Sequence, residues 1–176
     1  MIFKAADLRG AYVIEPERRA DFRGYFARTF CDKEFAALGL EARIAQCSVS
    51  FSQRKGTLRG MHYQLAPFEE VKVVRCLRGA IFDVIIDLRP GSPTFRKHFV
   101  AELDERNGNA LYVPAGFAHG FQTLTDNTEV FYQMSQYYSE SHARGIRWND
   151  PMFAIAWPKD KRTILKRDQN YPDFVE

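Results

Sequence analysis

The sequence predicts a single all-β domain, built as a barrel or as a double-sheet jelly roll. Three observations support this prediction. Apolar residues recur at every second position in most apolar segments, clusters of turn-forming residues separate those segments, and helical periodicity is confined to a few residues. A chain of 176 residues, of which 45% are hydrophobic, is long enough for one well-buried domain and short for two. We therefore expect residues 1–176 to form one domain.

The first clear element along the chain is a short helix in the sequence DKEFAALG, residues 32–39. Asp32 suits the N-cap position, and Gly39 is the kind of residue that ends a helix. The pattern supports one other helical turn, near the C-terminus. Helices are therefore expected to be short and peripheral.

Strand-like alternation is found in RGMHYQ, residues 59–64, and continues through most of the chain that follows. It is clearest in IFDVIIDLR, residues 81–89, where even-numbered apolar residues share one face while Asp83 and Asp87 fall on the other. Turn-forming clusters such as RPGSP and DERNGN separate the strands. The pattern predicts short, half-buried antiparallel strands, the others being residues 71–79, 98–103, 109–114 and 129–135.

Composition excludes several classes of protein. The formal net charge of +3 is spread along the chain, without a Lys/Arg block dense enough to follow a nucleic-acid backbone. No apolar run approaches the roughly 20 residues of a membrane helix, and no signal-peptide pattern is present. The cysteines, Cys31, Cys47 and Cys76, have no CxxC spacing, so neither a disulfide framework nor a zinc knuckle is indicated. We expect a soluble, cytoplasmic protein without nucleic-acid or membrane partners.

Four polar side chains on or beside the predicted strands are candidates for chemistry: His62, Lys72, His119 and Tyr132. Each has an ordinary structural alternative when taken alone. His62 could be a hydrogen-bonded core or surface histidine, and Lys72 could point outwards to solvent. His119 could only stabilise a turn, and Tyr132 could be an aromatic residue of the core. Strand parity puts His62 on the face of Leu58. An inward Lys72 would need an anionic partner or a function, because burying a lone ammonium is costly. Together these groups can move a proton beside a carbonyl.

The order of the motifs resembles a known family. RGMHYQ, KVVRCLRGAIFDVIIDLR, SPTF, YVPAGFAHGFQTL, Tyr132, RGIRWNDP and IAWP with Asp168 are similar to those of the RmlC-type cupins. These are the dTDP-4-dehydrorhamnose 3,5-epimerases and related nucleotide-sugar epimerases of deoxysugar and polysaccharide biosynthesis. The resemblance runs from Asp21 to about Pro172, nearly the whole chain. It implies a cupin-type double-stranded β-helix with a ligand cavity in the barrel.

The resemblance also implies catalytic roles. His62 matches the family's base, oriented by Asp168, and Tyr132 matches its proton donor. Lys72 matches the cation beside the sugar carbonyl. In a 4-ketohexose both C3 and C5 adjoin the carbonyl, so loss of either proton places charge on O4, which Lys72 or His119 can stabilise. Inversion then requires an acid on the face opposite the base.

Binding residues follow from the same resemblance. Arg23 and Arg59 match positions that contact the diphosphate and sugar, Gln46 and Ser48 match substrate contacts on the strand before the catalytic one, and Tyr138 matches an aromatic residue that stacks on the nucleobase. The family's subunits pair as dimers, and the segment with Arg23 reaches the partner's site. The resemblance therefore implies a homodimer and no cofactor.

The chain departs from the family pattern at four expected contact positions. Arg28 stands where the dTDP enzymes have glutamate, Ser48 where they have asparagine, Ala143 where they have glutamate, and Arg167 where they have lysine. Arginine can only donate hydrogen bonds, which suits acceptor edges such as cytosine N3 and O2 or guanine O6 and N7. The departures therefore suggest a base other than thymine, as in CDP or GDP, and leave the nucleotide open among dTDP, CDP and GDP.

Other activities remain open. A metal cupin usually carries a second histidine where this chain has Gln64, so no metal site is expected. A narrower enzyme of the family could invert only C3 or only C5, or could move the carbonyl as a ketoisomerase. A non-catalytic cupin that binds a nucleotide sugar is the alternative from another class, although it does not explain an intact acid and base.

Overall fold

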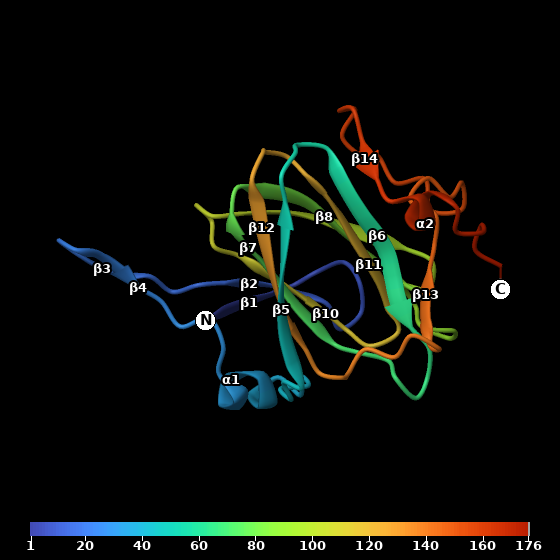
Figure 1. The fold of residues 1–176 in the computed structure, drawn as a ribbon. Helices are drawn as coiled ribbons and strands as arrows, with labels where there is room; N and C mark the ends of the chain where they lie inside the picture. Colours follow the sequence, from blue (N-terminus) through green and yellow to red (C-terminus); the bar gives the residue numbers. More distant parts are fainter. Residues whose placement is uncertain (176) are drawn as a thin grey trace.

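A computed structural model describes residues 1–175 of the chain. Two facing β-sheets form its body (Figure 1). The first sheet has the order β1 (Ile2–Ala5), β2 (Tyr12–Glu15), β10 (Ala110–Val113), β7 (Lys72–Arg78), β12 (Thr128–Met134) and β5 (Gln46–Ser52). The second has the order β13 (Ala143–Gly145), β6 (Thr57–Gln64), β11 (Phe117–Thr123), β8 (Ala80–Asp87) and β9 (His98–Asp104). All of these pairs are antiparallel, and β14 (Thr163–Ile164) adds a parallel pair to β6. The predicted all-β jelly roll is confirmed.

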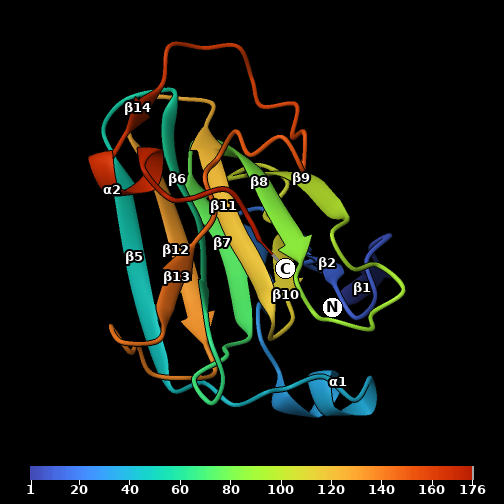
Figure 2. The ribbon, with the colours of Figure 1, turned by 90° about the vertical axis from the view of Figure 1, so that its right-hand side faces the viewer.

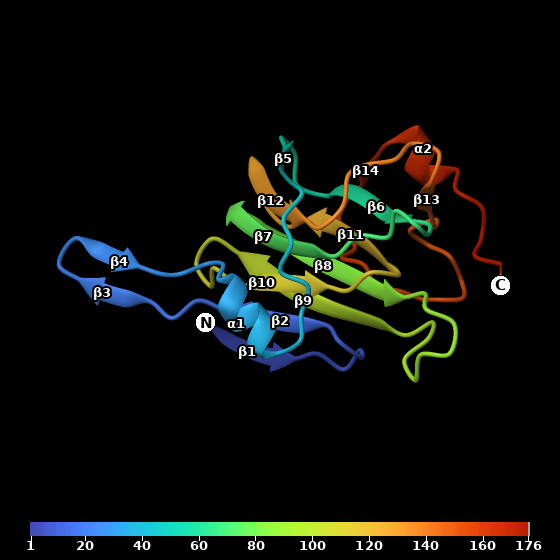
Figure 3. The ribbon, with the colours of Figure 1, turned by 90° about the horizontal axis from the view of Figure 1, so that it is seen from below.

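The remaining elements are small and peripheral. A two-stranded hairpin, β3 (Arg19–Asp21) with β4 (Gly24–Phe26), extends away from the barrel (Figures 1 and 3). The helices are α1 (Asp32–Ala37) and α2 (Lys166–Gln169). Among residues 1–175, neither helix has the length and apolar content needed to cross a bilayer.

The predicted first helix is confirmed, but its predicted cap is wrong. Cys31 occupies the N-cap position without a capping side-chain hydrogen bond, and Asp32 is the first helical residue. A carboxylate in the first turn still favours the helix, because it faces the positive end of the helix dipole. Gly39 follows the helix with a φ of 67°, and its N–H donates to Ala36 at 2.9 Å. Left-handed backbone after a helix favours glycine, as expected.

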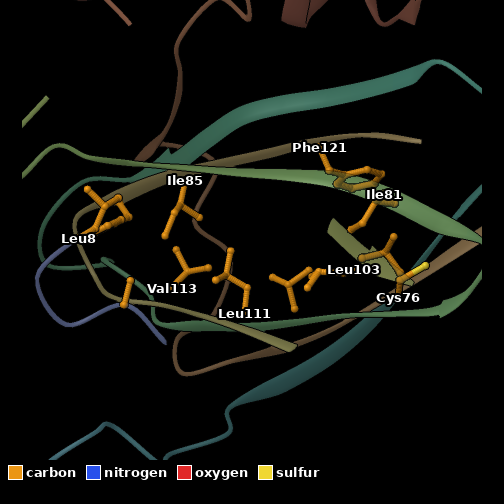
Figure 4. Close-up of a cluster of buried hydrophobic side chains, with 12 residues drawn as sticks. Leu8, Cys76, Ile81, Ile85, Leu103, Leu111, Val113 and Phe121 are labelled. Carbon is orange, nitrogen blue, oxygen red and sulfur yellow. The ribbon is translucent and has the colours of Figure 1, made fainter. Parts of the chain in front are cut away.

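The main hydrophobic core lies between the two sheets. Figure 4 shows its side chains pointing into the space between the strands. Val74 and Leu111 come from the first sheet, and Ile81, Ile85 and Phe121 come from the second. All are at most 1% exposed. This core fills one end of the barrel, so the polar residues of the same strands gather at the other end.

Both sheets are also covered on their outer faces, which explains one incorrect expectation. Phe35 of α1 packs against the first sheet, and Phe153 and Trp157 cover the second. The segment 81–89 was expected to be half-buried, with its aspartates facing water. Instead Asp83 and Asp87 are fully buried, because they share the inner face of β8 with Ile81 and Ile85, while the loops cover Val84 and Ile86 on the outer face.

A β-bulge sets the direction of the catalytic-motif side chains. The register between β6 and β11 shifts, so that Arg59 lies opposite Phe121 while His62 lies opposite His119. The extra residue on β6 turns both Arg59 and His62 towards the cavity described below, whereas Leu58 packs in the outer cluster. The predicted shared face of His62 and Leu58 is therefore wrong.

Gly60 is required at this bulge. Its φ is 114°, a conformation that side chains disfavour, and a Cβ there would lie 2.6 Å from Cα of Gly120. Neighbouring strands can approach this closely only where a side chain is missing.

Candidate active site

A cavity of about 720 Å³ opens between the two sheets at the end of the barrel opposite the main core. Its volume lies in the range of small-molecule sites. Gln46, Lys72 and Tyr132 line it from the first sheet, and His62 and His119 line it from the second. The structure thus brings together the four candidate side chains that lie between residues 62 and 132.

His62 forms a dyad with Asp168, as expected. His62 Nε2 lies 2.9 Å from Asp168 Oδ1, and Asp168 Oδ2 accepts the backbone N–H of Gly60 at 3.1 Å. Burial opposes ionisation of Asp168, but the hydrogen bond and charge of His62, the N–H of Gly60 and the charge of Arg167 together outweigh it, so the pKa of this carboxyl lies below its ordinary value. Asp168 is therefore a carboxylate at neutral pH, which holds the proton on Nε2 and leaves Nδ1 free to accept another.

Asp168→Asn is expected to lower kcat about 100-fold, at the low end of the effect of a positioned acid or base. The amide keeps the size of the side chain but no longer stabilises the imidazolium that forms when His62 takes a proton. Steady-state kinetics at several pH values will measure this, with Asp160→Asn on the surface as control. An unchanged kcat would contradict the orienting role.

Lys72 lies inside the barrel and has the anionic partner that its burial requires. Its Nζ is 3.0 Å from Glu70 Oε1, and the two side chains are 9% and 10% exposed. Gln64 Nε2 approaches the other Glu70 oxygen at 3.5 Å and donates to the Tyr137 carbonyl at 3.1 Å. The outward orientation considered for Lys72 is thus wrong, and Glu70, thought to share an outer face, faces the cavity as well.

His119 has a buried partner that sequence reasoning missed. His119 Nε2 lies 2.6 Å from Asp83 Oδ1, and the two side chains are 5% and 0% exposed. The other oxygen of Asp83 is buried without a hydrogen bond in the described part of the chain. Asp83 thus fixes the orientation of the His119 ring at the wall of the cavity, where an imidazole N–H can stabilise developing negative charge.

Tyr132 approaches the same space from the facing sheet. Its ring contacts the His119 ring edge to face, with centroids 6.0 Å apart. Burial raises the pKa of Tyr132, and the negative charge of Asp83 raises it further. The phenol therefore keeps its proton over the whole range in which enzymes work. His62 and Tyr132 stand on opposite walls of one cavity, as a base and an acid that invert a carbon must.

Most of the expected binding residues line the cavity: Gln46, Ser48, Arg59, Lys72, His119, Tyr138, Ala143 and Arg167. Arg59 reaches across the opening and donates to Phe51 O at 3.0 Å and to Ser52 Oγ at 3.2 Å. Arg167 lies 3.5 Å from the dyad carboxylate. A guanidinium at each side of the opening suits a diphosphate.

Two expected contacts lie elsewhere in this chain. Arg23 sits at the tip of the β3–β4 hairpin, where it pairs with Asp21 at 2.6 Å. Arg28 follows the hairpin and pairs with Glu34 at 2.8 Å. Neither lines the cavity. Figure 3 shows the hairpin projecting away from the side of the molecule that carries β6 and the C-terminal residues.

The motif RGIRWNDP holds the segment that carries Asp168. We call residues 165–175 the closing segment, which includes α2 and passes over β6 on the outside of the second sheet (Figure 2). Arg147 pairs with Asp173 at 2.5 Å, and Asp150 accepts the backbone N–H of Phe174 at 2.5 Å. These contacts make the motif a structural turn that fixes the far end of the closing segment.

Comparisons with known proteins agree with this geometry. A family model described as dTDP-4-dehydrorhamnose 3,5-epimerase matches residues 5–176. A dTDP-4-dehydrorhamnose 3,5-epimerase of Sinorhizobium fredii is 43% identical over 100% of this chain and 91% of its own length. A dTDP-4-dehydrorhamnose 3-epimerase of Streptomyces niveus is 37% identical over 97% of this chain and 82% of its own. The crystal structure of the Bacillus anthracis 3,5-epimerase with TDP and pyrophosphate bound has a TM-score of 0.95 and 38% identity, covering 98% of this chain and 99% of that one.

Proposed function

The chain belongs to the dTDP-4-dehydrorhamnose 3,5-epimerase family and is a carbohydrate epimerase, and from this premise we propose that it inverts C3 and C5 of a dTDP-linked 4-keto-6-deoxyhexose. The observation that carries the proposal is the placement of His62 and Tyr132 on facing sheets across one cavity. A base and an acid on opposite faces of a sugar ring are what inversion requires.

The reaction begins with proton removal by His62. Its Nδ1 takes the proton from a carbon next to the carbonyl, and the electron pair moves into an enolate with its charge on O4. Asp168 stabilises the imidazolium through Nε2, at the 2.9 Å contact described above. The carboxylate itself stays ionised throughout, because its pKa is held low.

The enolate oxygen needs positive groups that are already in place. Lys72 and the His119–Asp83 pair reach the cavity from facing sheets. In a site that excludes water, such fixed donors stabilise developing charge strongly. Tyr132 then gives its proton to the carbon from the side opposite His62, which inverts the configuration. The same enolate chemistry at C5 and C3 requires no metal or redox group.

The nucleotide is proposed to be dTDP because the curated relatives carry that nucleotide in their names. The case for CDP or GDP rests on Arg28, whose guanidinium pairs with Glu34 and stands outside the cavity of its own chain. Calorimetric titration with dTDP, CDP and GDP separates these options. Tighter binding of dTDP is the expected result, and tighter binding of CDP or GDP would contradict it.

A homodimer is proposed because the projecting hairpin is poorly covered in one chain. Phe22 is 99% exposed and Phe26 is 74% exposed, and Arg23 at the tip has its only described ion pair with Asp21. Apolar side chains this exposed on an arm suit contact with a second copy. Sedimentation analysis is expected to give twice the monomer mass, and Phe22→Asp is expected to shift it towards monomer.

A single-site 3-epimerase is the second candidate, because one relative of similar identity is named a 3-epimerase. Proton NMR in deuterated water decides between them with dTDP-4-keto-6-deoxyglucose as substrate. Deuterium incorporation at both C3 and C5 is expected. Incorporation at one carbon would make the protein a single-site epimerase, and incorporation at neither would refute the proposed reaction.

A further inference from the structure

The residue that stands beside the catalytic imidazole in the closing segment is Tyr171. It follows Asp168 by three residues, and its ring meets the His62 ring edge to face, with centroids 6.1 Å apart and planes at 77°. Asp168 and Tyr171 therefore both touch the imidazole from one short segment. The Asp168 carboxylate contacts the imidazole at Nε2, whereas the Tyr171 ring packs against the imidazole ring.

Gly145 provides the space for this ring. It lies on β13 directly opposite His62 on β6. A Cβ at Gly145 would fall 2.1 Å from Cε2 and 2.2 Å from Cζ of Tyr171, closer than any side chain can approach. The backbone of Gly145 has no positive φ, so an alanine would be free of backbone strain there. What excludes a side chain at this position is the ring of Tyr171.

The closing segment is held on both sides of Tyr171. On one side Asp168 bonds to His62 and Gly60, and on the other Phe174 packs against Phe153 with ring centroids 5.5 Å apart. The backbone N–H of Phe174 also donates to Asp150. The backbone on either side of Tyr171 is thus held in place, which keeps the ring beside His62.

The hydroxyl of Tyr171 plays no part in holding it. Across residues 1–175 this hydroxyl has no hydrogen-bond partner, and burial raises the pKa of Tyr171, so the phenol is neutral. The packing of the ring, not its polar group, is therefore the feature that acts on His62.

We propose that Tyr171 is a positioning residue for the base: its ring, seated on Gly145, restricts rotation of the His62 imidazole so that Nδ1 is aimed at the sugar. The inference deepens the proposed epimerase reaction and rests on it. A base that serves C3 and C5 must keep Nδ1 within reach of both carbons, which lie on either side of the carbonyl, so a change in the direction of the ring alters the two rates unequally. Misplacement by about 1 Å can cost on the order of 100-fold in rate.

The test compares Tyr171→Ala, Tyr171→Phe, Gly145→Ala and the double variant Gly145→Ala/Tyr171→Ala. Tyr171→Ala is expected to lower kcat by about 10- to 100-fold with little change in KM, and to change the ratio of deuterium incorporation at C3 and C5. Gly145→Ala, which displaces the ring, is expected to match it. Tyr171→Phe should keep the wild-type ratio. The double variant should be no worse than Tyr171→Ala, because the added methyl group then meets no ring.

Asn170→Ala, an exposed neighbour in the same segment, is the control and is expected to behave as wild type. The proposal is overturned if the double variant loses as much kcat as the two single variants combined. It is also overturned if the ratio of deuterium incorporation at C3 and C5 stays unchanged in both single variants. NMR of the His62 ring protons tests it without turnover. Those signals should shift similarly in Gly145→Ala and Tyr171→Ala, and unchanged signals in Gly145→Ala would overturn it even if the enzyme acts on another sugar. If the wild-type protein shows no deuterium exchange with this substrate, the proposed reaction is refuted, and the NMR comparison still decides the role of Tyr171.

Discussion

His62→Ala is expected to abolish deuterium incorporation at both C3 and C5 and to lower kcat by about 100- to 10,000-fold. Among the described residues that line the cavity, His62 is the imidazole that the proposed mechanism does not assign to the enolate oxygen, and its carboxylate partner binds Nε2. Lys72 is paired with Glu70 and His119 is paired with Asp83, and the mechanism assigns both to stabilising the charge on O4. Without His62 neither carbon loses its proton, so no enolate forms.

Binding should survive this change, because the arginines and Tyr138 at the opening of the cavity are untouched. Titration with dTDP should give an affinity within a few-fold of wild type, and the melting temperature should stay close to it. His98→Ala, an exposed histidine on β9 outside the cavity, serves as the matched control. Substantial exchange at either carbon in His62→Ala would assign the base elsewhere.

Tyr132→Phe is expected to separate proton exchange from inversion. His62 still removes the proton, but the acid on the opposite wall is gone. The enolate is then reprotonated from the side of His62, so deuterium enters with retained configuration. Product formation should fall by about 100- to 10,000-fold, while exchange falls much less. NMR measures both in one sample, from loss of the substrate proton signal and growth of the product signals.

Tyr12→Phe on β2, outside the cavity, is the control for the loss of a hydroxyl. Equal loss of exchange and product in Tyr132→Phe would mean that the phenol acts before the enolate forms, for example on the carbonyl oxygen. Normal product formation would show that another group donates the proton. The first result revises the role of Tyr132, and the second removes it.

Much of the fold could be predicted because period-two alternation is a local property. The strands over residues 71–79, 81–89, 98–103, 109–114 and 129–135 were recognised from their own residues, and the two short helices lie where the pattern put them. The strand β11, which carries His119, was missed, because its sequence GFAHG was interpreted as a turn. What failed depends on contacts between distant segments. The face of His62 changed because of the bulge between β6 and β11, and no local pattern encodes that register shift.

The candidate site was predicted through the family resemblance and only in part through chemistry. Asp83 was missed because an aspartate alternating with apolar residues normally marks a solvated face, whereas here it lies inside the barrel beside His119. The signal that could have found it is the combination of Asp83 and Asp87 in a strand whose other residues are all apolar. Tyr171 and Gly145 gave no signal at all, because their contact joins β13 to the closing segment.

The His62–Asp168 dyad joins two residues that are 106 positions apart in the chain, so its two halves come from different stages of the sequence. Every strand of the barrel, from β1 to β14, precedes Asp168 in the chain. A chain shortened before α2 would therefore keep every strand residue, His62 included, and would lack the carboxylate that completes the dyad.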